Sequence, residues 1–333
     1  MALLQRHVFF LAQKMGAVAQ APNEYYGQCS LRLQFEWHRL SCNQPSHEHL
    51  AVGKHYVPQA LLRNFQIPTQ PGFIWLYDKH DLKPHVACIS KVAQSQGYYS
   101  AETEVALARD VEIPGNRAIE RLLHGELLSP SERIDLSYYI CTTLMRGPRR
   151  RRKAHEKLPQ VLAETTAEIR SEIAESAATA DLAWVTHCLA EVDAAEQKFS
   201  SAPPPLVIAH IQEPWPYESM VDAVDEMAWR VLESSGPSYF ITSDNPVFLV
   251  DCFGLAQQDS EISFPLSTTK TLHGCQEGKP RSLTFMQAPQ WLVRETNRRL
   301  VSETERLVFC HEEEPWLPQM LSKKHPFLSV IKW

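Results

Sequence analysis

A long helical tract in the middle of the chain is the feature that most constrains its fold. Residues 102–199 are largely Ala- and Glu-rich, helix-forming sequence, and Gly147-Pro148 interrupts them. Apolar runs typical of strands lie on both sides of this tract, within residues 73–89 and 238–286. The sequence therefore predicts a helix-rich α+β fold, with a mixed sheet and a long central helical region.

Helix-terminating residues predict where several helices begin and end. Ser129–Glu132 forms a capping box with proline at the first helical position. Pro114-Gly115 is expected to stop one helix, and Gly147-Pro148 to break the helix that begins after Ser129. Residues 217–234 and 289–308 are each expected to form one helix, because their apolar residues follow helical spacing.

The same pattern divides the chain into regions. Residues 1–50 have weak periodicity and are expected to be an extension or linker. Residues 54–312 are expected to form one catalytic or binding domain, with a helical subregion at 102–199 and a sheet-rich part at 217–312. Residues 313–333 remain as a C-terminal segment.

Composition excludes several classes of protein. The net charge of -6 excludes a globally basic nucleic-acid binder. Gly is scarce, at 12 residues, and no glycine-rich phosphate loop of the Rossmann or P-loop type occurs. No apolar run reaches the roughly 20 residues of a membrane-spanning helix. The eight cysteines are dispersed without a Cys-x-x-Cys pair, which predicts free thiols and a cytoplasmic protein.

A polar turn between two apolar runs is the strongest candidate site. Ser243, Asp244 and Asn245 lie between the strand-like runs 238–242 and 247–250. Polar residues at strand ends are well placed to form sites, because Asp supplies a carboxylate and Asn both a donor and an acceptor. The alternative is a turn in which these side chains satisfy local backbone groups.

Two further motifs carry candidate residues. His55 and Gln59 are four residues apart, so a helix places them on one face, where His55 could act as acid, base or metal ligand, or as a helix cap. Arg146 ends an apolar helix and could bind a phosphate or carboxylate, or pair with Asp244. The adjacent basic run Arg149–Lys153 could contact nucleic-acid phosphates or be a solvated helix start.

A metal site is a third expectation. Glu104 and Glu112 are eight residues apart, near one helical face. Together with Asp244 they could hold a divalent ion, Mg²⁺ or Mn²⁺. The alternative is that both glutamates are solvated.

Three segments together resemble a bacterial family known as domain of unknown function 4238. They are Lys54–Gln59 with Leu62–Phe65, Phe240–Val247, and Phe264–Ser267. The resemblance covers residues 54–312. Arg146-Gly147-Pro148 and Asn297 fall where that family has an Arg-x-Pro element and a late Asn. The resemblance implies a residue list but no reaction.

Three functions follow as hypotheses. The first is an enzyme, most simply a metal-dependent nuclease or phosphodiesterase-like hydrolase, acting on a phosphate-containing substrate or nucleic acid. His55 would be its acid or base, and Asp244 with Glu104 or Glu112 would hold the ion. The second is a metal-free modifying enzyme on a small or peptide-linked substrate, and the third a non-catalytic interaction module. Both enzyme hypotheses require His55 and Asp244 to share one pocket.

Overall fold

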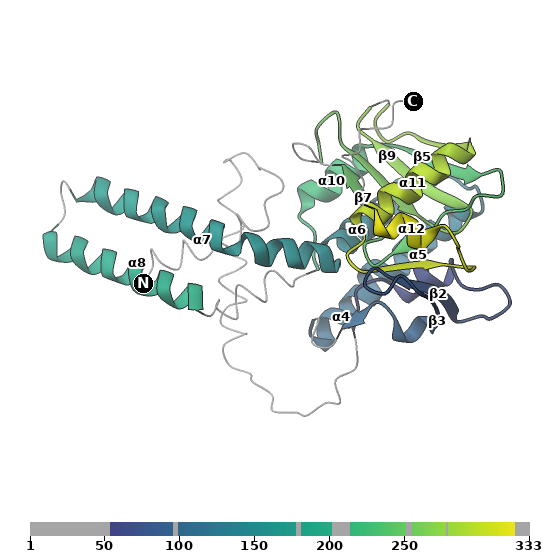
Figure 1. Cartoon of the computed structure of the whole chain (residues 1–333). Helices are drawn as coiled ribbons and strands as arrows, with labels where there is room; N and C mark the ends of the chain where they lie inside the picture. Colours follow the sequence, from purple (N-terminus) through teal and green to yellow (C-terminus); the bar gives the residue numbers. More distant parts are fainter. Residues whose placement is uncertain are drawn as a thin grey trace.

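Two main sheets and a projecting helical hairpin organise the chain (Figure 1). The computed structural model describes residues 54–95, 99–177, 181–201, 214–250, 255–277 and 279–323. The expected extension at residues 1–50 lies outside these ranges, as do residues 324–333 of the C-terminal segment and residues 202–213. The architecture is α+β with mixed and antiparallel sheets, which confirms the fold class predicted from the sequence.

The larger sheet has five strands in the order β10-β5-β9-β8-β7. Their bounds are β10 Leu283–Ala288, β5 Ala228–Ser234, β9 Lys270–Cys275, β8 Glu261–Pro265 and β7 Phe248–Val250. Only the β10–β5 pair is parallel, and the other pairs are antiparallel. Trp229 of β5 is fully buried in the core, and the Arg133 guanidinium stacks 3.7 Å from its ring centre.

The smaller sheet is antiparallel and carries the polar turn. Its order is β3-β2-β11-β6, with β3 Pro84–Cys88, β2 Phe73–Asp78, β11 Leu307–Cys310 and β6 Thr242–Ser243. A separate two-stranded sheet pairs β1, Lys54–His55, with β4, Gln94–Ser95. The 242–246 turn therefore starts from one sheet, and His55 lies in another.

Helices cover the sheets and form the hairpin. The first group is α3 Gln59–Arg63, α4 Ala101–Leu107, a π-helical turn Ala108–Glu112, α5 Ile113–Leu123 and α6 Pro130–Arg146. The second group is α7 Pro148–Ser176, α8 Leu182–Ser201, α10 Glu218–Glu226, α11 Gln290–Glu303 and α12 Leu317–Ser322. The expected capping box is present, because Glu132 N–H donates to Ser129 Oγ and Ser129 N–H to Glu132 Oε2.

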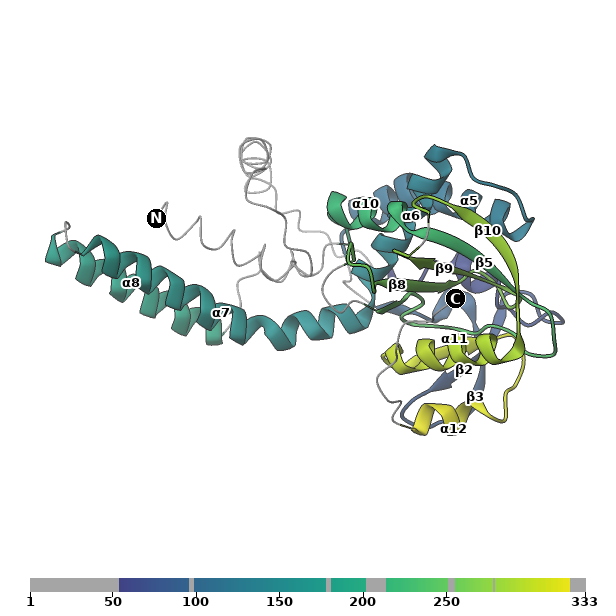
Figure 2. The same ribbon diagram turned by 90° about the horizontal axis from the view of Figure 1, so that it is seen from above.

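Helices α7 and α8 pack on each other and extend away from the rest of the structure (Figures 1 and 2). Their shared core contains Ile169, Ile173 and Val192. Arg170 of α7 pairs with Asp193 and Glu196 of α8, at 2.7 and 2.6 Å. The long central helical region predicted from the sequence is thus divided into helices of the main body and this hairpin.

Two of the expected helices are partly wrong. The helix predicted over 217–234 ends at Glu226, because Met227 adopts an extended backbone and 228–234 becomes a central strand of the larger sheet. The helix predicted over 289–308 ends at Glu303, and β11 follows. In both places strand pairing overrides helical spacing.

Pro114 does not stop its helix as expected. The chain stays helical through it, because Pro114 lies in the first turn of α5, where the missing N–H costs little. The π-helical turn just before it closes with the Ile113 N–H donating to the Ala108 carbonyl. This turn carries Glu112 at its end.

The remaining expectations concern membrane-spanning helices and the state of the cysteines. Within the described ranges, no helix is both long and apolar enough to cross a bilayer. Five cysteines in these ranges, Cys88, Cys141, Cys188, Cys275 and Cys310, are free thiols, as predicted for them.

Candidate functional site

His55 lies at the edge of a buried polar cluster. It ends β1, and its backbone carbonyl accepts a hydrogen bond from the Tyr99 hydroxyl at 2.9 Å. Its Nε2 is buried and meets no hydrogen-bond partner among the described residues. Burial lowers the pKa of the imidazole, against a backbone hydrogen bond with Ser90 and the charge of Glu112, which raise it. His55 is therefore a neutral imidazole at pH 7, with one open nitrogen.

Arg146 is the centre of this cluster. It is the last residue of α6, it is 1% exposed, and its Nη1 donates to Glu112 Oε1 at 2.8 Å. Burial is the largest influence and lowers the pKa of the guanidinium, but the charge and hydrogen bond of Glu112 together with Tyr99 and Tyr139 raise the pKa overall. Arg146 also acts electrostatically on His55 and on Tyr99. A permanent cation thus lies inside the molecule, held by one carboxylate.

Glu104 supplies a second carboxyl group. It lies on α4, and its Oε2 is buried without a hydrogen-bond partner in the described part of the chain. Burial raises the pKa of this carboxyl, and the nearby charge of Glu112 raises it further. Lys54 and Arg146 act in the opposite direction. We call His55, Tyr99, Glu104, Glu112 and Arg146 the Arg146 cluster.

Sequence reasoning missed two tyrosines near Arg146. Tyr99 hydrogen-bonds the His55 carbonyl and interacts with Arg146. Tyr139 of α6 is fully buried, and its hydroxyl finds no partner in the described ranges. A signal existed for Tyr139, because it is seven residues before Arg146 and therefore on the same face of α6. No comparable spacing connects Tyr99 with Arg146.

The polar turn at 242–246 has a different character. The Asp244 carboxylate accepts hydrogen bonds from the backbone N–H groups of Glu305, Arg306 and Leu307, at 2.9, 2.7 and 2.8 Å. Burial raises the pKa of this carboxyl to about 6, although these three donors and Lys79 lower it. Asp244 therefore organises the 305–307 segment, which is more than 60 residues away in sequence and not the local backbone that the turn interpretation expected.

Ser243 and Asn245 are engaged in the same way. Ser243 Oγ accepts a hydrogen bond from the Asn245 N–H at 3.1 Å. The Asn245 amide Nδ2 donates to the Glu303 carbonyl at 3.3 Å. The candidate side chains of this turn are bound to backbone groups of the protein itself.

The structure does not group His55 with Asp244. His55 is influenced by Glu112 and Arg146, whereas its neighbour Tyr56 is influenced by Asp244 and Arg306. Tyr56 follows β1 directly, so the residue next to His55 feels the charge of Asp244. The side chains of His55 and Asp244 have different neighbours, so we describe two clusters, and the common pocket expected around both stays a prediction.

The expected metal ligands do not converge either. Glu104 and Glu112 act on each other in the Arg146 cluster, whereas Asp244 belongs to the other cluster. Throughout the ranges that the structure describes, no three His, Cys, Asp or Glu side chains are placed to hold a metal ion. The trio predicted from helical spacing is therefore not assembled.

Gln59 and Asn64 make hydrogen bonds within the protein. Gln59 Oε1 accepts a hydrogen bond from Arg63 Nη2 at 3.3 Å, on the exposed side of α3. Asn64 Nδ2 donates to the Leu266 carbonyl at 2.8 Å. This bond joins the first and third of the motif segments, so part of their shared pattern has a structural explanation.

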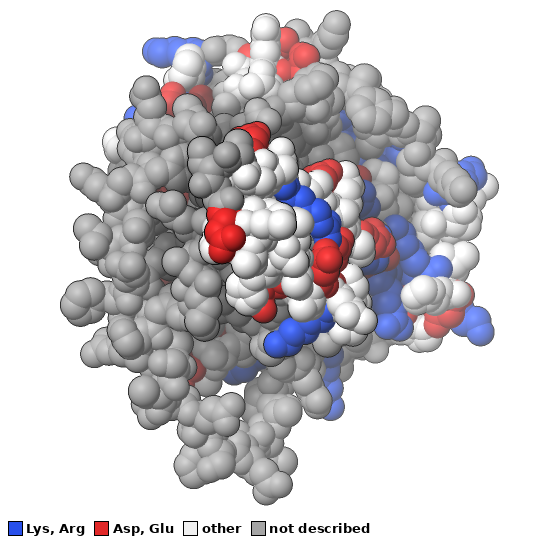
Figure 3. All heavy atoms as spheres, turned by 90° about the vertical axis from the view of Figure 1, so that its left-hand side faces the viewer, with Lys and Arg blue, Asp and Glu red and all other residues white. Residues whose placement is uncertain are grey.

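Two residues of the basic run are paired with acidic residues of the body. Arg149 pairs with Glu303 at 2.9 Å, and Arg152 pairs with Glu305 at 2.5 Å and with Glu156 at 2.6 Å. On the face seen in Figure 3, described cationic and anionic side chains lie intermixed. The run attaches α7 to the 303–305 segment.

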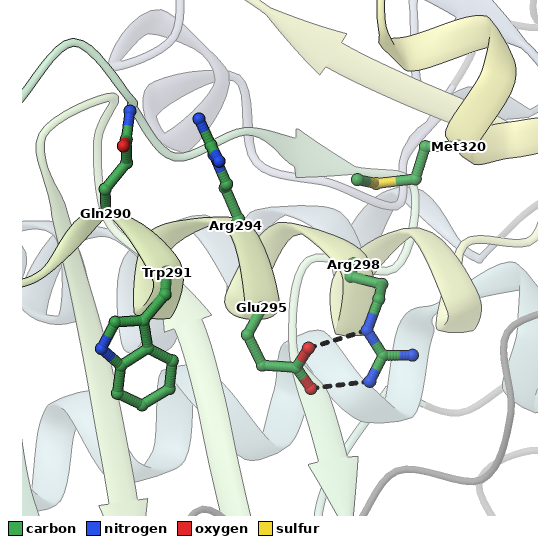
Figure 4. Close-up of a pocket in the computed structure, with 6 residues that line it drawn as sticks. All are labelled: Gln290, Trp291, Arg294, Glu295, Arg298 and Met320. Carbon is green, nitrogen blue, oxygen red and sulfur yellow. Dashed lines mark hydrogen bonds and ion pairs between the residues drawn. The ribbon is translucent and has the colours of Figure 1, made fainter.

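A groove of about 780 Å³ lies between α11 and α12 (Figure 4). Gln290, Trp291 and Arg294 line it with Met320, and Glu295 forms an ion pair with Arg298 at 2.7 Å. Trp291 is 60% exposed, so it is not a core residue. The groove is open, and none of its lining residues belongs to the Arg146 cluster.

Comparison with known proteins supplies a family. Residues 54–314 match the family described as "Protein of unknown function (DUF4238)". The match spans most of the chain, which therefore belongs to this family, as the three motif segments indicate. No curated protein and no solved structure matches the chain significantly.

Proposed function

We propose that this member of the DUF4238 family is an enzyme that transfers protons through the Arg146 cluster, with His55 as base and Glu104 as acid. The observation that supports this most strongly is the pair of open atoms, His55 Nε2 and Glu104 Oε2, near one buried arginine. Buried polar atoms are almost always hydrogen-bonded, so two without partners in one cluster require an explanation. A substrate that supplies the missing partners is such an explanation.

The different environments of His55 and Glu104 give the two residues different roles in proton transfer. Burial keeps His55 neutral, so Nε2 can accept a proton. Burial and the Glu112 charge hold the proton of Glu104 to higher pH, so its carboxyl can donate one. Neighbouring titratable groups whose pKa values are shifted by burial and by a specific charged neighbour are typical of functional sites.

Arg146 has an electrostatic role in this proposal. It is buried, and its charge is stabilised by the ion pair with Glu112. A preorganised cation stabilises negative charge that develops on a substrate, at no cost of reorganisation. Glu112 is then a positioning residue for the arginine.

This arrangement favours a metal-free modifying enzyme or hydrolase on a small or peptide-linked substrate. The metal-dependent nuclease remains the alternative proposal, and it needs Asp244 near Glu104 or Glu112. Asp244 is engaged by three backbone N–H groups, and Arg149 and Arg152 by carboxylates. The geometry therefore supports proton transfer better than ion-assisted phosphate cleavage.

An activity panel tests the two proposals together. The full chain is assayed on nitrophenyl esters, peptide nitroanilides, nitrophenyl phosphodiesters and single-stranded DNA, with EDTA, Mg²⁺ or Mn²⁺. We expect turnover of an ester or amide that EDTA leaves intact, and losses of about 100-fold or more in His55→Gln and Glu104→Gln. His124→Gln and Glu102→Gln are matched controls, because both residues are exposed and Glu102 shares α4 with Glu104.

The outcomes separate the hypotheses. Nuclease activity that needs Mg²⁺ or Mn²⁺ and survives His55→Gln would favour the metal-dependent alternative. Turnover of no substrate on the panel, or equal turnover in all variants, would contradict an acid–base site and favour an interaction module.

A further inference from the structure

The junction of α6 and α7 consists of a single residue. Arg146 ends α6, Pro148 begins α7, and Gly147 between them has an extended backbone, with φ -63° and ψ 142°. The position of Arg146 and the direction of α7 therefore both depend on Gly147. Any L-residue adopts this backbone, so conformation alone does not require glycine here.

The space around position 147 does require glycine. A Cβ added to Gly147 would lie 2.9 Å from Asn245 Oδ1, closer than real Cβ contacts. The Asn245 side chain cannot easily move, because its Nδ2 donates to the Glu303 carbonyl. The polar turn at 242–246 thus abuts the junction next to Arg146.

The other side of the junction is attached to the same segment of chain. Arg149, in the first turn of α7, contacts the Glu303 carboxylate at 2.9 Å and the Ser302 carbonyl at 3.4 Å. Asp244 holds the backbone of 305–307 through its three hydrogen bonds. Residues 302–307 therefore join the polar turn to the start of α7, with Gly147 between them.

We propose that Asn245 is a positioning residue of the Arg146 cluster: it holds the α6–α7 junction at Gly147 and so sets the place of Arg146 beside Glu112 and His55. This inference gives the 242–246 turn a role in the site without placing it among the reacting groups. It rests on the proposed function only in treating the cluster as the site, because its central claim is a mechanical coupling between Asn245 and Arg146.

The coupling has a readout that does not need a substrate. The Arg146 charge lowers the pKa of His55, and the Glu112 charge raises it. A displaced Arg146 therefore raises the pKa of His55. Titration of the imidazole signals by NMR measures this in the folded full chain, with the His55 signal assigned by its loss in His55→Gln.

The experiment compares two variants and a control. Gly147→Ala forces the junction away from Asn245, and we expect the pKa of His55 to rise by about half a pH unit. Adding Asn245→Ser to Gly147→Ala shortens the obstructing side chain, so much of this rise should disappear. Gly236→Ala is the control, because nothing lies within 4 Å of the added Cβ.

Each result has a definite meaning. An unchanged His55 pKa in folded Gly147→Ala, or an equal rise with and without Asn245→Ser, would overturn the inference. If Gly147→Ala does not fold, Asn245→Ser alone should still raise the pKa, because the hold on the junction is loosened, and no change there would overturn the inference. Failure of the activity panel would leave this coupling intact, so the two proposals fail separately.

Discussion

The two polar regions of this chain differ in what their side chains contact. In the 242–246 turn, Asp244, Ser243 and Asn245 are bound to backbone groups of the protein. In the Arg146 cluster, His55 Nε2 and Glu104 Oε2 are buried and open among the described residues. Both regions are polar and enclosed by apolar sequence. The side chains of Ser243, Asp244 and Asn245 are hydrogen-bonded within the protein, whereas two atoms of the Arg146 cluster have no partner among the described residues.

This difference shows that motif strength does not identify a reacting group. Both motifs are long, yet the side chains of the 242–246 turn satisfy the backbone of a segment about 60 residues away in sequence and of the turn itself. A residue that reacts needs only a position and an open atom. The predictions below test whether the two regions really divide stability and chemistry between them.

The largest expected effect is at Asp244. Asp244→Ala removes the buried acceptor of three part-buried backbone N–H groups, which then lose their only acceptor among the described contacts. We expect a loss of about 4 kcal/mol or more in the free energy of unfolding, measured by urea denaturation followed by circular dichroism. Asp222→Ala, at an exposed position on α10, should change it by no more than about 0.5 kcal/mol.

An Asp244→Ala variant as stable as the wild type would contradict the structural role that we assign to the 242–246 turn. Its carboxylate would then have no structural role, and it would return to the list of reacting groups. A loss of activity at unchanged stability would point the same way.

The second effect is a pH dependence of opposite sign in the two regions. The Asp244 pKa is raised from 3.8 to about 6, so its stabilising contribution is full below pH 3.8 and is lost as the pH rises through 6. Relative to Asp244→Asn, the wild type should lose about 3 kcal/mol of stability across that interval, because each pH unit is worth about 1.4 kcal/mol.

His55 should act in the opposite direction. Its pKa is lowered from 6.5 by burial, so its contribution is present above pH 6.5 and is lost as the pH falls. Relative to His55→Gln, the wild type should therefore become less stable on acidification. Urea denaturation of the three proteins from pH 4 to 7.5 measures both slopes, and equal slopes would contradict the different environments.

Two tyrosines offer a third, smaller test. The Tyr77 hydroxyl donates to the Glu314 carbonyl at 3.2 Å and accepts from the Glu314 N–H at 2.6 Å, whereas the Tyr139 hydroxyl has no partner in the described chain. Tyr77→Phe should cost about 1–2 kcal/mol in thermal or urea unfolding. Tyr139→Phe should cost nothing or stabilise the fold by up to about 1 kcal/mol. A cost at Tyr139 equal to that at Tyr77 would mean that its hydroxyl is satisfied, and would weaken the case for an open cluster.

Local sequence predicts the parts of this molecule that depend on near neighbours. The capping box at Ser129 and the break at Gly147-Pro148 are each determined within a few residues, and each is present. The end of α10 at Glu226 is not predicted, because residues 228–234 follow helical spacing but are recruited between β10 and β9. Pairing with distant strands decides that boundary.

The site follows the same rule. Glu104 and Glu112 are close in sequence, and the charge of Glu112 raises the pKa of Glu104. The contact of Arg146 with Glu112 depends on how α6 packs against the π-helical turn, and the position of His55 near these charges depends on the fold as a whole. No spacing in the sequence encodes that packing. The metal prediction therefore took its third carboxylate, Asp244, from the 242–246 turn.

The smallest stability effect, and the sharpest functional one, is at Glu104. Glu104→Gln keeps the shape of the side chain but removes a carboxyl that burial and Glu112 disfavour in its charged form. The free energy of unfolding should change by less than about 0.5 kcal/mol, with any change toward greater stability. Glu102→Gln on the same helix removes an exposed carboxyl and is the matched control for both stability and turnover.

If Glu104→Gln retains full turnover on a substrate that His55→Gln cannot process, the acid must be another group, and Glu104 has no role in the reaction. If it loses turnover while its unfolding curve overlies that of the wild type, the cluster keeps an atom for chemistry that folding does not use.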